Sequence, residues 1–185
     1  MIRGSDAASA MKSFLHLLST LAALLCVSCG GGSLDYAEAS APTASYQVAV
    51  VKGFGYKVDE PDARGAQLSK EFASVLVEEI QNVGKFSKVT TAPQSGRALR
   101  IEGDVTYLAE GNSALRIGIG MGAGSAHFSC TGRFIDNSTG KLLGTFEVER
   151  SSKSGLRGVA DNFPIIRRSA AGDIAEKAAE FTATP

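Results

Sequence analysis

The sequence has few of the residues on which most catalytic and metal centres are built. It contains no tryptophan, two histidines and three cysteines among its 185 residues. Zinc sites need several histidine, cysteine or carboxylate ligands, and serine or cysteine nucleophiles need a nearby base, so the scarcity of histidine disfavours both kinds of centre. The 19 Lys and Arg residues balance the 19 Asp and Glu residues. This balance excludes the strongly basic surface that nucleic-acid-binding domains carry.

Long apolar runs are also absent. The longest covers residues 14–27 and is interrupted by three polar side chains. A transmembrane helix needs about 20 apolar residues, whereas a run of this length is typical of a secretory signal peptide. Met11-Lys12 directly precedes the run, so we expect translation to start at Met11 rather than at Met1.

The apolar run ends in a pattern that resembles the cleavage box of bacterial lipoproteins. Val27, Ser28 and Cys29 fit this pattern, although Cys26 stands where leucine is usual. We therefore predict cleavage between Ser28 and Cys29 and attachment of acyl chains, palmitate among them, to Cys29. Gly30 after the cysteine implies sorting to the outer membrane. An ordinary signal peptide cut nearby and an uncleaved anchor are the alternatives.

These predictions divide the chain into a signal peptide at 1–28, a lipidated N-terminus with a flexible linker at 29–45, and a single α/β domain at 46–183. The linker is rich in Gly, Ala and Ser and lacks an apolar period, so we expect a coil reaching about 20 to 25 Å. Removal of the signal leaves 17 basic and 18 acidic residues, a net charge of −1. It also leaves Cys130 without a cysteine partner, which excludes a disulfide scaffold.

Apolar periodicity in the remaining chain predicts an α/β fold of the α+β kind, with a mixed, largely antiparallel sheet of about five strands packed against two helices. The segment at 127–135 should pair with 141–150 through the turn at 136–140. A polar loop is expected at 151–164. We expect strands at 46–54, 86–91, 99–107, 127–135 and 141–150, and helices at 63–83 and 166–181.

The least typical segment carries glycine at every second position. Each glycine inside a strand costs roughly 0.5 to 1 kcal/mol relative to alanine, so the pattern needs an explanation. The segment forms a bent or flexible connection, a bare face that admits a neighbouring helix or subunit, or a contact with lipid or a small ligand. Neither G-x-G-x-x-G nor a P-loop occurs, which disfavours nucleotide binding. The candidate interface residues are Gly118, Gly120, Gly122 and Gly124.

Catalytic groups are hard to find elsewhere. Glu78 and Glu79 fall on the solvated face of the first predicted helix, and Glu147 and Glu149 fall on the wet face of a strand. The remaining histidine lies near a serine that lacks the G-x-S-x-G context of a nucleophile. We therefore predict no catalytic, cofactor-binding or metal-binding residue.

Three stretches of the sequence resemble the bacterial lipoprotein-associated family described as domain of unknown function 4410. They are Ile101–Val105, Gly120–Ala126 and Ile135–Leu143. The resemblance covers roughly residues 46–181. It implies no activity and no catalytic residues. The one residue role that it implies is that of the lipidated cysteine, at Cys29.

A more distant resemblance involves the segments Val48–Phe54 and Leu68–Val83. They are similar to the N-terminal domain of the Tol-Pal translocation protein and to the periplasmic part of the curli secretion channel. These relatives imply a two- or three-layer α/β domain with a mixed sheet.

Three hypotheses about function follow. The leading one is a non-enzymatic, lipid-anchored outer-membrane protein that faces the periplasm and binds another envelope component or itself. The second is a subunit of an oligomeric outer-membrane channel or secretion assembly, in which residues 99–148 contribute membrane-inserting hairpins. A small-ligand hydrolase is the third and is disfavoured. We expect no cofactor, no nucleic acid and no small-molecule substrate.

Overall fold

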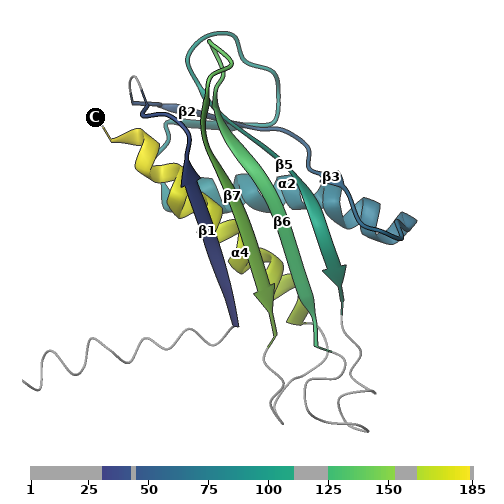
Figure 1. Ribbon diagram of the computed structural model, residues 1–185. Helices are drawn as coiled ribbons and strands as arrows, with labels where there is room; N and C mark the ends of the chain where they lie inside the picture. The colour runs from purple at the N-terminus through teal and green to yellow at the C-terminus, as the bar shows by residue number, and fades with distance from the viewer. Residues whose placement is uncertain (1–30, 43–44, 111–124, 153–161, 184–185) are drawn as a thin grey trace, which may run out of the picture.

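The computed structural model describes residues 31–42, 45–110, 125–152 and 162–183, which form two layers: one sheet and two helices that cover one of its faces (Figure 1). The strand order is β1-β7-β6-β5-β2-β4, and β3 also pairs with β5. Pairs among β1, β7, β6 and β5 are antiparallel, and those of β5 with β2 and β3 and of β2 with β4 are parallel. The predicted α+β class with a mixed, mostly antiparallel sheet is confirmed. The elements are β1 (Gly31–Glu38), β2 (Val48–Val51), β3 (Gly55–Tyr56), α2 (Ala63–Val83), β4 (Lys88–Thr90), β5 (Leu99–Ala109), β6 (His127–Asp136), β7 (Leu142–Ser151), α4 (Asn162–Ala179) and the 3₁₀-helix η1 (Glu180–Thr182).

Helix α2 has the bounds that its apolar stripe predicts. Asp62 caps its start by accepting a hydrogen bond from the Gly65 amide at 2.8 Å. Gly84 ends the helix in the left-handed conformation, with φ of 69°, which glycine adopts without a steric penalty. Every third or fourth residue is buried against the sheet, as in Phe72 and Leu76.

Helix α4 begins four residues earlier than its periodicity predicts and takes up the end of the expected loop. Its buried residues are mostly small, as Ala170, Ala171 and Ala178 show. Alanine adds little to an apolar period, so the sequence signal of this helix is weak. Small side chains allow the helix to lie close to the sheet and to α2.

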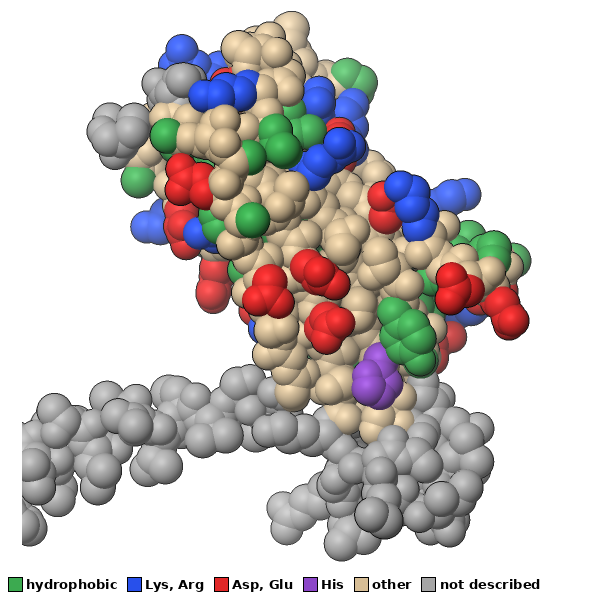
Figure 2. Space-filling view, viewed as in Figure 1, with side chains coloured by type: hydrophobic (Ala, Val, Ile, Leu, Met, Phe, Trp, Pro, Cys, Tyr) green, Lys and Arg blue, Asp and Glu red, His purple; other side chains and the backbone are tan. Residues whose placement is uncertain are grey.

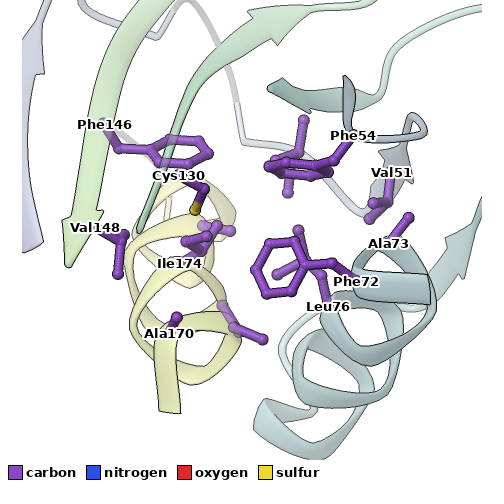
Figure 3. Close-up of a cluster of buried hydrophobic side chains, with 14 of the residues drawn as sticks. Val51, Phe54, Phe72, Ala73, Leu76, Cys130, Phe146, Val148, Ala170 and Ile174 are labelled. Carbon is purple, nitrogen blue, oxygen red and sulfur yellow. The ribbon is translucent and has the colours of Figure 1, made fainter. Parts of the chain in front are cut away.

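The core lies between the sheet and the helices and is centred on aromatic rings (Figure 3). The Phe72 ring meets Phe54 edge-on, with 5.0 Å between the ring centroids, and lies 4.7 Å from Phe128. Such pairs add to the stabilisation from buried apolar area. Cys130 is fully buried in this cluster, and burial raises the pKa of its thiol.

Two glycines in the middle of the sheet leave room for the aromatic rings of Phe54 and Phe146. Gly103 in β5 and Gly132 in β6 are directly opposite each other. A Cβ atom on Gly103 would lie 2.8 Å from the Phe54 ring, and one on Gly132 would overlap the Phe146 ring. Both positions are well inside van der Waals contact, so the rings pack against backbone that must stay bare.

The first strand corrects the predicted flexible linker at 29–45. Residues 31–38 form β1, which pairs with β7 over eight residue pairs. Leu34 and Tyr36 pack against the core, while Asp35 between them is exposed. Only these two apolar positions alternate, which is too short a pattern to predict a strand among Gly, Ala and Ser residues.

The Tyr36 side chain explains why this edge strand is held. Its ring lies over Gly144 of the neighbouring strand, where a Cβ atom would clash with it. The Lys177 ammonium lies 4.0 Å from the ring centroid on the helix side. The folded unit therefore includes residues 31–38, which the sequence assigned to a linker. Over the described residues the sheet has seven strands instead of about five, because β1 and the two-residue β3 join it.

Candidate functional site

The candidate site is the open face of the sheet, opposite the helices. In Figure 1 both helices lie behind the strands, and Figure 2 shows the uncovered face with its charged side chains. Alternate residues of β1, β7, β6 and β5 point to this face, because their neighbours in each strand fill the core. A shallow groove of about 1120 Å³ crosses it, and its lining includes Asp35, Lys52, Asp104, Thr131, Arg133 and Glu147.

Most charges on the β5 side of this groove are paired. Lys57 Nζ lies 2.7 Å from Asp104 Oδ2, and Arg133 Nη2 lies 2.7 Å from Glu102 Oε1. Arg100 Nε lies 3.2 Å from the other Glu102 oxygen, without hydrogen-bond geometry. The basic partners at Lys57 and Arg133 are well exposed, so each pair contributes at most about 1 kcal/mol. These residues make a neutralised surface rather than a poised acid and base.

The β1 side of the groove is acidic. Asp35 and Glu147 are directly opposite each other in the β1–β7 ladder, and Glu149 lies two residues further along β7. Within the described residues none of the three forms an ion pair. Like charges placed opposite one another are mildly destabilising. The face therefore has an excess of negative charge near one edge, which favours contact with a basic surface.

The other predicted carboxylate pair has a structural role. Glu78 and Glu79 both contact Arg168, at 3.1 and 3.2 Å. Arg167 approaches Glu71 at 3.5 Å. These contacts join α2 to α4. Glu78 stays exposed, as the sequence predicts, whereas Glu79 is half-buried beside Arg168. Glu147 and Glu149 lie on the wet face of β7, as the sequence predicts.

His127 lies at the start of β6 on the open face, where it is exposed. Its ring meets that of Tyr107 edge-on, with 6.2 Å between centroids. Within the described residues no three His, Cys, Asp or Glu side chains are close enough to hold a metal ion. Among the described residues, this arrangement offers an exposed binding surface.

A buried polar pair lies at the opposite end of the sheet and was missed by sequence reasoning. The Tyr46 hydroxyl donates to Asp136 Oδ2 at 2.8 Å, and Asp136 Oδ1 accepts from the amides of Ser138 and Thr139. Burial alone would raise the pKa of Asp136, but hydrogen bonds from Ser138, Tyr46 and Thr139 lower it to about 2. Burial and this hydrogen bond raise the pKa of Tyr46. The pair ties the entry to β2 to the β6–β7 turn. The Asp-Asn-Ser-Thr-Gly sequence predicts that turn but not its partner.

The predicted cleavage and lipidation residues, Ser28 and Cys29, lie outside the described residues, as do Gly118, Gly120, Gly122 and Gly124. These remain predictions. In the described part of the chain, neither helix is long and apolar enough to cross a membrane.

The family model described as domain of unknown function DUF4410 matches residues 35–155. The chain belongs to this family. The match begins within β1, eleven residues before the resemblance noted at Tyr46. A search of curated proteins finds no match. The DUF4410 assignment carries no activity, so the site has to be interpreted from its own geometry.

Solved structures with a similar fold include two crystal forms of the PelC dodecamer from Paraburkholderia phytofirmans. The form in space group C2, a point variant, is 18% identical with a TM-score of 0.57, and the form in space group P6 is 16% identical with a TM-score of 0.58. Each comparison covers 80% of this chain and 97% of the PelC chain. A protein of the DUF330 family from Xanthomonas campestris is 14% identical, with a TM-score of 0.48, and the comparison covers 76% of this chain and 90% of that one. At such identities the PelC structures share the fold alone with this DUF4410 domain.

Proposed function

We propose that this DUF4410 protein is a non-enzymatic binding module of the bacterial cell envelope, anchored to the outer membrane through a lipid on Cys29 and facing the periplasm. The open sheet face is the observation that carries this proposal. It presents a broad charged surface on which Lys57 pairs with Asp104 and Arg133 pairs with Glu102. Such a surface suits a protein partner, because its charges give specificity and speed of encounter rather than chemistry.

A second copy of the chain is the first partner to consider. The PelC structures, which share the fold over 97% of their chain, are dodecamers. The open face joins an acidic edge at Asp35 and Glu147 to a side that carries Lys52 and Lys57. A face with both signs of charge can meet another copy in a head-to-tail arrangement, and such contacts form a ring when the rotation between copies closes.

The PelC dodecamers also favour the second hypothesis, a subunit of an oligomeric outer-membrane channel or secretion assembly. In that role the chain would act as a folded α/β domain. The strands β5, β6 and β7 bury one face against α2 and α4, and the other face carries charge. Insertion of these strands into a bilayer would expose the core and place carboxylates in lipid.

Metabolic labelling with an alkyne analogue of palmitate tests the anchor. We expect the full-length protein and its Cys26→Ser variant to incorporate the label, because Cys26 precedes the cleavage site, and the Cys29→Ser variant to incorporate none. Equal labelling of all three proteins, or of none, would contradict anchoring at Cys29.

The mass of the detergent-solubilised lipoprotein, measured by light scattering after size exclusion, tests self-association. We expect a multiple of the protomer mass, reduced by Glu147→Lys on the open face and unchanged by Lys70→Glu on the exposed surface of α2. A monomeric wild-type protein would remove self-association. Equal effects of the two variants would remove the open face as the interface.

A further inference from the structure

One end of the sheet gathers the start of β1 with the ends of three other strands. Gly31 pairs with Ser151 in the ladder between β1 and β7, and Ser151 pairs with His127. His127 in turn pairs with Ala109, the last residue of β5. These four residues form one row across the sheet, called here the terminal row, at the lower end in Figure 1.

The start of β1 fixes where a lipid on Cys29 would emerge. Cys29 precedes Gly31 by two residues, and two residues span at most about 7 Å. Gly31 itself is held in the sheet, with its carbonyl accepting from the Ser151 hydroxyl at 3.3 Å. A lipid on Cys29 would therefore be attached close to the terminal row, with no long linker between the lipid and the sheet. This step rests on the anchor proposed above.

Of the three large hydrophobic side chains that are exposed in the described part of the chain, two lie at this same end. Tyr107 is 54% exposed and Ile165 is 67% exposed, while the third, Leu142, is 36% exposed and lies at the opposite end, where β7 begins. Tyr107 lies on the open face, as does its partner Ser129, which is two residues from the terminal row. The histidine of that row, purple in Figure 2, lies at the lower end of this face.

Ile165 reaches the same end from the helix layer. It lies in the first turn of α4, where the ring of Phe163 meets Phe128 with 6.3 Å between centroids. Phe128 adjoins the terminal row, being the neighbour of His127. Tyr107 and Ile165 therefore flank the end of the domain, one from each layer.

Among the described residues, most charged groups near this end are neutralised by ion pairs. Glu110, which follows β5, pairs with Arg64 of α2 at 3.2 Å. Arg150, opposite Gly32, pairs with Asp173 of α4. Glu149 forms no ion pair with any described residue and lies in the row of Tyr107, two strands away. A carboxylate without an ion pair must stay hydrated. Glu149 therefore limits how far along the strands, counted from the terminal row, the sheet can contact an apolar environment.

We propose that the terminal row of the sheet rests on the bilayer surface, with Tyr107 and Ile165 at the level of the lipid headgroups. The partner is the lipid surface itself. Tyrosine suits this depth because its ring is apolar and its hydroxyl stays hydrated. The strands then run away from the membrane, and the turn between β6 and β7 lies farthest from it. The acyl chains supply the affinity, and the two side chains set the orientation.

The lack of tryptophan makes a direct test simple, because one substitution adds a single fluorescent reporter. The variants are Tyr107→Trp at the terminal end and Leu142→Trp at the opposite end, each in the lipidated protein. They are reconstituted in vesicles of phosphatidylethanolamine and phosphatidylglycerol, with or without phosphatidylcholine brominated near the top of its acyl chains. Unchanged far-ultraviolet circular dichroism and melting temperature establish that both variants are folded.

We expect brominated lipid to reduce the emission of the Tyr107→Trp variant and to leave that of Leu142→Trp unchanged. Flotation of the same samples on a density gradient separates the two proposals. Protein that floats without quenching of the Tyr107→Trp variant, or with equal quenching of both variants, overturns the orientation and leaves the anchor intact. Protein that fails to float overturns the anchor and the orientation together.

Discussion

The hydroxyl of Tyr46 donates a 2.8 Å hydrogen bond to Asp136, ninety residues further along the chain. Tyr46 is fully buried and Asp136 is 4% exposed, so the bond joins two groups that have lost contact with water. It connects the chain entering β2 with the turn that ends β6. A buried hydrogen bond to a charged group is among the stronger polar interactions in a domain.

Loss of the Tyr46 hydroxyl should weaken the fold. We expect Tyr46→Phe to lower the free energy of unfolding by roughly 1 to 3 kcal/mol, because the Asp136 carboxylate loses a partner while staying buried. Urea denaturation followed by circular dichroism measures the change. Tyr107→Phe removes an exposed hydroxyl and is the matched control, for which we expect no measurable change.

The pKa of Asp136 predicts how stability depends on pH. Hydrogen bonding lowers this pKa to about 2, below the ordinary value of 3.8 for an aspartate. A depressed folded-state pKa stabilises the protein above the unfolded-state value, and this contribution is lost as the pH falls through about 2. We expect the stability of wild type relative to Asp136→Asn to decline between pH 4 and pH 2. A constant difference over that range would contradict this role for Asp136.

The bare backbone at Gly132 should tolerate no side chain. We expect Gly132→Ala to lower the free energy of unfolding by about 1 to 3 kcal/mol, because the new methyl group displaces the Phe146 ring. Gly172→Ala in α4 is the control. Outside its own stretch of helix, no atom lies within 4 Å of the added Cβ, so the better helix former should stabilise the protein by roughly 0.5 to 1 kcal/mol. Thermal unfolding of both variants measures the contrast.

The Phe72 ring should be the most sensitive side chain of the core. It is fully buried and contacts both Phe54 and Phe128. We expect Phe72→Ala to cost about 3 to 5 kcal/mol through lost burial and the remaining cavity. Chemical denaturation measures the cost, and Lys70→Ala on the exposed face of the same helix should change it by less than about 0.5 kcal/mol.

The position of β1 should depend on Tyr36. We expect Tyr36→Ala to speed amide hydrogen exchange in residues 33–38 and to leave exchange in β5 and β6 unchanged, because the strand loses its contacts with Gly144 and Lys177. Asp35→Ala, on the open face of the same strand, is the control. Faster exchange throughout the sheet would mean that β1 unfolds only with the whole domain.

Sequence reasoning succeeded where a pattern was long. The stripe through Leu68, Phe72 and Leu76 fixed the bounds of α2, and strict alternation located the strands from Leu99 to Arg150. It failed where tertiary contacts determine whether a segment forms a strand or a helix. The strand β1 depends on Tyr36 finding Gly144 and Lys177, and α4 depends on alanines that only a close neighbour makes useful.

The candidate site was harder to predict than the fold. The wet face of β7 was correctly assigned, but no local pattern brings Asp35 opposite Glu147 when the strand carrying Asp35 is expected to be a linker. The Arg168 contacts with Glu78 and Glu79 likewise join segments about ninety residues apart, a separation that periodicity does not address.

The pairing of β1 with β7 has a mechanical consequence. A force that pulls on the chain before Gly31 acts along the axis of β1, and the hydrogen bonds that join its eight residues to β7 cross that axis. The bonds are therefore loaded together in shear and do not open one after another, as they would if the strand were peeled from the sheet. Tension on the N-terminus is shared by the whole sheet through this edge strand.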